Sequence, residues 1–199
     1  MSSAVVHLID DDEHVRRALA FLLGTAGFAV RVYDSASTFL EKYGDKPEGC
    51  VVSDVRMPGM DGLQLLRKLK EIDSGTPVIV MTGHADVALA VEAMKAGAVD
   101  FIEKPFPDET LIQAIEMALA RRDKMLPAAD AGQIRARLAS LTQREREVLD
   151  GLLAGHPNKT IAYDLGLSPR TVEVHRANVM TKMAASSLSE LVRMTLSAG

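Results

Sequence analysis

The stretch CVVSD, residues 50–54, is a short apolar run that ends in a carboxylate. Three similar runs occur in the first half of the chain, and each precedes polar residues: VVHLI before Asp10 and Asp11, VIVM before Thr82, and VDFIE before Lys104. Short apolar runs separated by helical patterns are typical of buried strands in a parallel sheet. We therefore predict an α/β fold, a doubly wound parallel sheet of five strands in the flavodoxin-like order 2-1-3-4-5.

The polar residues after these runs are expected to meet at one edge of the sheet. In the 2-1-3-4-5 order the carboxyl ends of the parallel strands converge on one crevice, with Asp54 in its middle. Three carboxylates there, Asp10, Asp11 and Asp54, would repel one another unless a cation neutralised them. Oxygen ligands suit Mg²⁺, which keeps several waters and is often held by one or two carboxylates and a phosphate. The pattern therefore predicts a Mg²⁺ site with room for a phosphoryl group.

Asp54 is the candidate nucleophile of this site. An aspartate carboxylate can accept a phosphoryl group as an acyl phosphate. The ammonium of Lys104 and the metal would offset charge on the transferring oxygens, and Thr82 would supply a hydroxyl.

The motif DVRMPGMDG, residues 54–62, together with Lys104-Pro105, resembles the receiver domain of bacterial two-component response regulators over about residues 4–122. The resemblance implies a sensor histidine kinase as phosphodonor, a switch driven by phosphorylation and a Lys104-Pro105 bond that can be cis. It assigns these roles: phosphoacceptor Asp54; Mg²⁺ ligands Asp10, Asp11, Asp54 and the backbone carbonyl of Arg56; phosphoryl contacts Thr82 and Lys104; switch residues Thr82 and Phe101.

Two other interpretations of the acidic residues were weighed. Carboxylates after strands are often only helix caps, but four strand ends carrying chemically matched residues favour a site. The run Asp10-Asp11-Asp12 also contains the Asp-x-Asp of phosphatases of the haloacid dehalogenase type. That family has Thr or Val soon after, whereas Glu13-His14 follow here, and the motif after Asp54 stays unexplained.

Bulk properties agree with an intracellular two-domain protein, and the receiver resemblance implies a cytoplasmic regulator rather than an enzyme. The 199 residues are 47% hydrophobic, which allows a sizeable core, and neither a secretory segment nor a membrane span is evident. The single Cys50 cannot form an internal disulfide, and the five His residues show no zinc-ligand spacing. Charge is uneven, with 14 Lys/Arg against 20 Asp/Glu (−6) through residue 126 and 9 against 7 (+2) afterwards.

A change of composition separates the two predicted domains. A helical pattern from Asp108 to about Lys124 leads into MLPAADAG, residues 125–132, where Pro, Gly and small residues break it. Residues 133–139 look helical again, so the connection is expected to be partly ordered. The predicted ranges are a receiver domain at 1–123, a linker at 124–136 and a C-terminal domain at 137–199.

Helix start and stop signals follow closely in the C-terminal domain. Thr142 and Glu145 form a capping-box pattern before a helix that ends near residue 155. Asn158 is placed to cap a short helix, Gly166 supplies a turn, and Ser168-Pro169 starts the next helix with Pro at its favoured first position. The pattern predicts a helix-turn-helix, although capped helices around a turn can also form a plain interaction module.

The third helix of this domain has one apolar stripe, formed by Val172, His175, Val179 and Met183. The opposite face is expected to enter the major groove of DNA, with flanking polar groups on phosphates. The predicted base-facing residues are Arg170, Glu173, Val174, Ala177 and Thr181; the predicted phosphate contacts are Lys159, Thr160, Thr171, Arg176 and Asn178, with Ser168 at the helix start.

Three motifs, LTQREREVL at 141–149, NKTIA at 158–162 and TVEVH at 171–175, resemble the LuxR-type DNA-binding domain over about residues 137–199. Some relatives have Lys at the positions of Glu173 and Ala177, but Glu173 can accept a hydrogen bond from cytosine. The resemblance implies promoter DNA and RNA polymerase as partners. It also favours a homodimer through the last helix, roughly 188–196.

From end to end the sequence is also similar to regulators that activate nitrogen-fixation genes at low oxygen after phosphorylation by an oxygen-sensing haem kinase. We therefore expect a transcriptional activator that dimerises on phosphorylation of Asp54. The alternatives are a constitutive DNA binder whose receiver is a phosphate sink, and an aspartyl-phosphate phosphatase.

Overall fold

The structure is a computed structural model that describes residues 4–43, 48–73, 75–83, 87–123 and 129–198. It divides into two compact units, Met1–His84 with Ala96–Met125, and Ala85–Lys95 with Leu126–Gly199. The division assigns helix α4 (Val87–Lys95) to the second unit. Residues 124–128 of the predicted linker lie outside the described residues.

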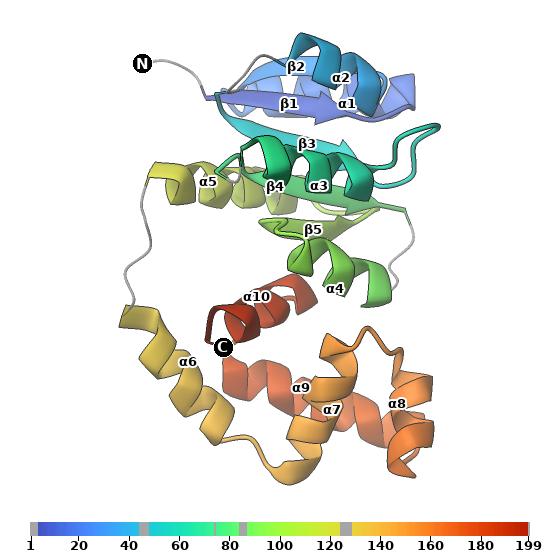
Figure 1. Cartoon of the computed structure of the whole chain (residues 1–199), viewed down its shortest axis with the longest axis vertical. Coiled ribbons are helices and arrows are strands. Elements are labelled where there is room, and N and C mark those ends of the chain that lie inside the picture. Colours follow the sequence, from blue (N-terminus) through green and yellow to red (C-terminus); the bar gives the residue numbers. More distant parts are fainter. Residues whose placement is uncertain (1–3, 44–47, 74, 84–86, 124–128, 199) are drawn as a thin grey trace. The chain divides into compact units, whose positions relative to one another are not determined.

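The first unit is built on a parallel sheet of five strands in the order β2-β1-β3-β4-β5, which confirms the predicted topology (Figure 1). Its strands are β1 (Val5–Ile9), β2 (Ala29–Tyr33), β3 (Cys50–Asp54), β4 (Val78–Thr82) and β5 (Asp100–Glu103). The register aligns Ile9 with Ser53, Asp54 with Met81, and Thr82 with Glu103. The carboxyl ends of β1, β3, β4 and β5 are therefore level at one edge.

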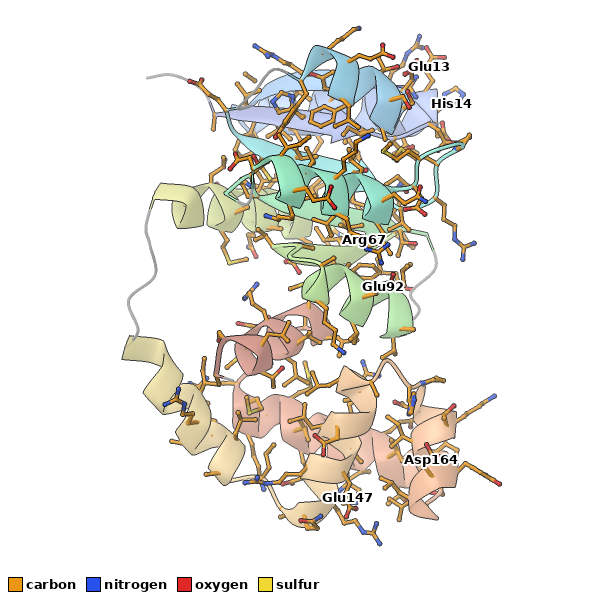
Figure 2. All side chains as sticks on the ribbon, viewed as in Figure 1. Glu13, His14, Arg67, Glu92, Glu147 and Asp164 are labelled. Carbon is orange, nitrogen blue, oxygen red and sulfur yellow. The ribbon has the colours of Figure 1, made fainter. Side chains whose placement is uncertain are left out.

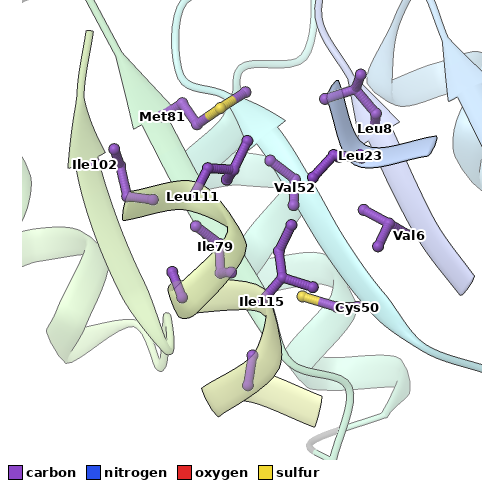
Figure 3. Packing of buried hydrophobic residues seen from close by; sticks show 12 residues of the cluster. Val6, Leu8, Leu23, Cys50, Val52, Ile79, Met81, Ile102, Leu111 and Ile115 are labelled. Atoms are coloured by element: carbon purple, nitrogen blue, oxygen red, sulfur yellow. The ribbon is translucent and has the colours of Figure 1, made fainter. Parts of the chain in front are cut away.

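Helices cover both faces of this sheet because right-handed crossovers place them there. They are α1 (Glu13–Thr25), α2 (Ala36–Lys42), α3 (Gly62–Ile72) and α5 (Asp108–Asp123). On the face covered by α1 and α5, alternate strand residues such as Val52 and Ile79 pack with Leu23 of α1 and Ile115 of α5 (Figure 3). Cys50 lies in this core, and burial raises the pKa of its thiol to about 12.

The second unit is helical and contains a helix-turn-helix. Besides α4 it comprises α6 (Ala129–Ala139), α7 (Gln143–Leu153), α8 (Asn158–Leu165), α9 (Pro169–Met183) and α10 (Leu188–Ala198). The predicted stripe of α9 points inward, because Val172, Val179 and Met183 are fully buried. None of the described helices is long and apolar enough to cross a membrane.

Of the three predicted N-terminal helix caps of this unit, two are present in the structure and one is not. Thr142 and Glu145 form the capping box of α7, and Ser168 caps α9 with Pro169 in the first turn. The prediction for Asn158 is wrong, because Pro157 is the N-cap residue of α8 and makes no side-chain cap. The amide oxygen of Asn158 instead accepts a hydrogen bond from Arg176 of α9 at 3.5 Å, so a tertiary contact replaces the local one.

Candidate functional site

The edge where the strands end brings together a lysine and two buried carboxylates. Nζ of Lys104 donates to Oδ2 of Asp10 at 2.7 Å and to Oδ1 of Asp54 at 2.6 Å. Asp10 follows β1, Asp54 ends β3 and Lys104 follows β5, so three strands supply the three groups. The Asp10 and Asp54 side chains are only 2% and 10% exposed, which makes these ion pairs poorly screened by water.

Backbone amides occupy the remaining carboxylate oxygens. The amide of Arg56 donates to Oδ2 of Asp54 at 2.6 Å, and the amide of Asp12 donates to Oδ1 of Asp10 at 2.9 Å. The guanidinium of Arg16 donates to the backbone carbonyl of Asp10 at 2.7 Å. Every carboxylate oxygen of Asp10 and Asp54 thus accepts a hydrogen bond, which fixes both groups in orientation.

Burial affects the pKa of Asp54 more than the neighbouring Lys104 does. Burial raises the pKa of Asp54, and the hydrogen bond and charge of Lys104 only partly oppose this shift. Burial also acts to lower the pKa of Lys104, but the hydrogen bonds and charges of Asp10 and Asp54 outweigh it, so the pKa of Lys104 is raised. A further cation or hydrogen-bond donor at this edge would therefore stabilise the carboxylate form of Asp54.

The other predicted residues of this edge differ in their burial. Thr82 is fully buried at the end of β4, and its backbone carbonyl accepts the amide of Lys104 at 2.7 Å. Phe101 of β5 is half-buried and pairs in register with Val80, two residues before Thr82. Asp11 is exposed, unlike Asp10 and Asp54. Lys104-Pro105 is a cis peptide bond, as the sequence allowed.

The turn after Asp54 lies against the same edge of the sheet, and only glycine fits at position 62 of this turn. A Cβ built on Gly62 would lie 2.1 Å from the backbone oxygen of Asp54, so any side chain would collide with the site. The amide of Gly62 donates to the carbonyl of Val55 at 2.9 Å, and Asp61 begins α3 with a capping box. The motif therefore closes the chain tightly around Asp54.

The oxygen donors at this edge have the chemistry that Mg²⁺ prefers. Among the residues that the structure describes, no group of three or more His, Cys, Asp or Glu side chains is arranged around a metal position. Asp10, Asp54 and the exposed Asp11 nevertheless offer negatively charged oxygen donors. Burial raises the pKa of Asp54 despite the nearby Lys104, so a further cation would stabilise its carboxylate form. The donor set therefore fits a hard divalent cation.

A second candidate site lies on α8 and α9. Arg170, Glu173, Val174, Ala177, Asn178 and Thr181 are exposed along α9, and Lys159 and Thr160 are exposed at the start of α8. Two predicted phosphate contacts also have partners inside the unit: Arg176 bonds Asn158, and the hydroxyls of Ser168 and Thr171 lie 2.8 Å apart at the helix cap.

Tyr163 is an exposed residue of this surface that the sequence analysis missed. It is 88% exposed, one helical turn after Lys159 and Thr160, so all three share one face of α8. Its neighbour Asp164, labelled in Figure 2, lies 3.7 Å from Nδ1 of His156. The signal that could have revealed Tyr163 is its i+3 and i+4 spacing from two predicted DNA contacts.

Comparison with known proteins gives consistent matches for both units. The model of the response regulator receiver domain matches residues 6–116, and that of bacterial regulatory proteins of the luxR family matches residues 139–195. The transcriptional regulatory protein FixJ of Rhizobium meliloti is 56% identical, with 100% of this chain and 98% of that protein covered. FixJ of Azorhizobium caulinodans is 57% identical, covering 99% and 94%.

Solved structures agree with these sequence matches. Full-length FixJ from B. japonicum is 53% identical with a TM-score of 0.58 and covers 100% of this chain and 98% of its own. The structure of the FixJ N-terminal domain, FixJ-N, is 50% identical with a TM-score of 0.57, covering 64% of this chain and 99% of its own.

Proposed function

Because the chain belongs to the response regulators of the FixJ type, with a receiver domain and a LuxR-type DNA-binding domain, we propose that phosphorylation of Asp54 switches it into a dimer that binds promoter DNA. Its family consists of transcriptional regulators rather than classical enzymes. The observation that carries the proposal is the buried Asp10–Lys104–Asp54 cluster at the carboxyl edge of the sheet.

In the proposed reaction, an oxygen of Asp54 attacks the phosphorus of a phosphohistidine on a sensor kinase. The new P–O bond forms as the P–N bond breaks, and the imidazole leaves with the electron pair and takes up a proton. Lys104 stays within reach of the transferred group, since it already bonds Asp54, and its ammonium offsets the negative phosphoryl oxygens. The result is an acyl phosphate on Asp54.

Receiver domains of this family bind Mg²⁺ at the phosphorylation site. In this chain we assign the ligands to Asp10, Asp11, Asp54 and the backbone carbonyl of Arg56. When bound, Mg²⁺ offsets the charge of the carboxylates and of the incoming phosphoryl oxygens. The amide of Arg56 already bonds Asp54, so its carbonyl is on the backbone segment nearest the nucleophile.

Thr82 and Phe101 form the proposed switch. Thr82 would turn its hydroxyl to the phosphoryl group, and the half-buried ring of Phe101 would move further inward. Strands β4 and β5 are joined here by the bond from the Lys104 amide to the Thr82 carbonyl, so a shift at one strand reaches the other. A coupling of about 1–3 kcal/mol would be enough to raise DNA affinity appreciably.

For DNA recognition we assign base contacts to Arg170, Glu173, Val174 and Ala177 at the exposed start of α9. Lys159, Thr160, Asn178 and Tyr163 would contact phosphates, while Ser168, Thr171 and Arg176 act partly through the bonds that hold α8 and α9. From the family resemblance we further propose a FixL-like kinase as phosphodonor, nitrogen-fixation genes at low oxygen as targets, recruitment of RNA polymerase, and a cytoplasmic location.

The test is to incubate the full chain with Mg²⁺ and a small acyl phosphate and to follow intact mass and size-exclusion elution together. We expect one added phosphoryl group and a shift from monomer to dimer, both absent in Asp54→Asn. Labelling without dimerisation would favour a phosphate sink with constitutive DNA binding. Continuous release of phosphate that survives Asp54→Asn but not Asp10→Asn would instead indicate a phosphatase.

A further inference from the structure

Helix α6 is built into the core of the DNA-binding unit. Ile134 is only 9% exposed and belongs to the same apolar cluster as Val148, Val179 and Leu191, and Leu138 packs against that cluster. The match to the luxR family begins only at residue 139, the last residue of α6. Ile134, which lies in the range predicted as a linker, is therefore a core residue outside the range that matches the family.

The side chain of Arg137 on α6 reaches the end of the recognition helix α9. Nη1 of Arg137 donates to the backbone carbonyl of Met183 at 2.9 Å, across 46 residues of sequence, and the bond is partly buried. Met183 is the last residue of α9, where carbonyls lack helical partners and the helix dipole is negative. A guanidinium at this position satisfies a free carbonyl and offsets the dipole at once.

The end of α9 needs such support. The next residue, Ala184, has φ +53°, a left-handed conformation that L-residues other than Asn and Asp rarely adopt. Its amide donates to the carbonyls of Met180 and Thr181, and the amide of Ala185 donates to Met180 at 2.9 Å. These bonds hold only while Ala184 keeps its strained conformation.

A second cation, Lys182 on α9, also connects the end of α9 to the chain after α6. Nζ of Lys182, in the last turn of α9, donates to the carbonyl of Ser140 at 3.3 Å and to Oε2 of Glu145 at 2.7 Å. Ser140 directly follows α6, and Glu145 closes the capping box of α7. The end of α9 is thus tied to α6 by Arg137 and to the segment after α6 by Lys182.

We propose that Arg137 is a positioning residue for DNA recognition, which fixes the C-terminal end of α9 from α6. The inference rests on the proposed function, because it concerns how α9 is presented to DNA. Since α6 is the element that follows the connection from the receiver, a displacement of α6 would break the Arg137 contact and leave the end of the recognition helix held by Lys182 alone of these two cations.

The direct test is amide hydrogen exchange on the full chain. Arg137→Gln removes the charge, and the amides of Ala184 and Ala185 should then exchange about fivefold faster, since a charge-assisted bond and a dipole contact are lost. Arg137→Lys keeps the charge and should restore most of the protection. Arg135→Gln is the matched control: Arg135 is exposed on the same helix, and its Nε donates weakly to Ala198 at 3.4 Å rather than to α9.

The functional arm uses the phosphorylated full chain and a duplex enriched from a random library by the parent protein. Arg137→Gln should lower the ratio of affinities for this duplex and a scrambled one about fivefold, whereas a general loss of folding would lower both affinities. Adding Ala184→Gly to Arg137→Gln should recover part of the ratio, because glycine adopts the left-handed conformation without strain.

The outcomes separate the inference from the function on which it rests. Exchange and affinity ratios equal to those of the parent in Arg137→Gln would overturn the inference alone. Failure of the parent to enrich any duplex would overturn the proposed DNA binding, and the role of Arg137 in it. If Arg137→Gln does not fold, Arg137→Gln with Ala184→Gly is compared with Arg137→Lys with Ala184→Gly, and equal exchange at Ala185 in these two would overturn the inference.

Discussion

Nζ of Lys104 lies 2.6 Å from Oδ1 of Asp54, although 50 residues separate the two in the sequence. The same nitrogen bonds Asp10, 94 residues away, so one cation holds two carboxylates that would otherwise repel each other. The cluster therefore stabilises the fold while keeping Asp54 next to a positive charge.

Lys104→Gln should destabilise the receiver unit and strengthen its affinity for Mg²⁺. Loss of the ammonium leaves Asp10 and Asp54 without their shared cation, which should cost about 1–3 kcal/mol of unfolding free energy at neutral pH because Lys104 is partly exposed. The site also becomes one charge more negative, so Mg²⁺ should bind about tenfold more tightly. Urea unfolding with chelator and with Mg²⁺ measures both effects. The exposed Lys42→Gln serves as control, and an equal response of the two variants would contradict the prediction.

Gly62→Ala should destabilise the chain and disturb phosphorylation, whereas Gly24→Ala should not. The new Cβ at position 62 would lie 2.1 Å from the Asp54 carbonyl, and backbone must move to make room. We expect a loss of about 2–3 kcal/mol and slower labelling of Asp54. Gly24 lies in α1 with nothing within 4 Å of the added atom, so alanine there should stabilise by about 0.5–1 kcal/mol. Thermal unfolding of both variants measures the change in stability. Similar losses of stability in the two variants would contradict the prediction that position 62 has no room for a Cβ.

Stability should fall below pH 6.5 because of His7. The ring is 3% exposed, with Nδ1 at 3.1 Å from the Tyr33 hydroxyl and Nε2 at 3.2 Å from the Glu48 carbonyl, and it packs among Tyr33, Phe39 and Tyr43. Burial has the largest effect on the pKa of His7 and lowers it from 6.5. The hydrogen bond to the Glu48 carbonyl acts to raise this pKa, and the charge of Arg31 has a smaller lowering effect.

The sign follows from proton linkage. Below pH 6.5 the unfolded chain binds a proton at this residue that the folded chain resists, so the contribution of His7 is present above pH 6.5 and is lost as the pH falls. Urea unfolding at a series of pH values should show a shallower decline below pH 6.5 in His7→Gln than in the parent. Identical slopes would mean that His7 titrates alike in both states.

Substitutions on α8 and α9 should weaken DNA binding in two different ways. Lys159→Ala should reduce affinity for all duplexes alike and lower the salt slope by about 1, as expected for a lost phosphate contact. Glu173→Ala should instead relax preference at one base position by about 1–3 kcal/mol. Tyr163→Phe should behave like a mild Lys159→Ala, since only a hydroxyl is removed. Affinity for an enriched and a scrambled duplex across salt concentrations separates these effects, and a base-specific loss in Lys159→Ala would reverse the assignment.

Much of this architecture was predictable because its signals are local. Apolar runs ending in polar residues predicted four of the five strands, since parallel strands buried on both faces need such runs, and the strand order is the one predicted from the flavodoxin-like fold class. Caps at Thr142 and Ser168 were read correctly because a cap is satisfied within three residues. The motif around Asp54 carried the receiver resemblance, and the family matches confirm it.

The tertiary structure decided what depends on residues far apart in the chain. Asn158 bonds Arg176 instead of capping α8, and Arg137 of α6 bonds the Met183 carbonyl at the end of α9. Asp11 is exposed, whereas its neighbour Asp10 is buried. The tertiary structure also made α6 part of a core. By itself the sequence determined which segments fold and which chemistry each can offer, because propensity and burial pattern act over a few neighbours. Only packing determined which of those groups meet, since most buried polar atoms are paired with whichever partner the fold brings within reach.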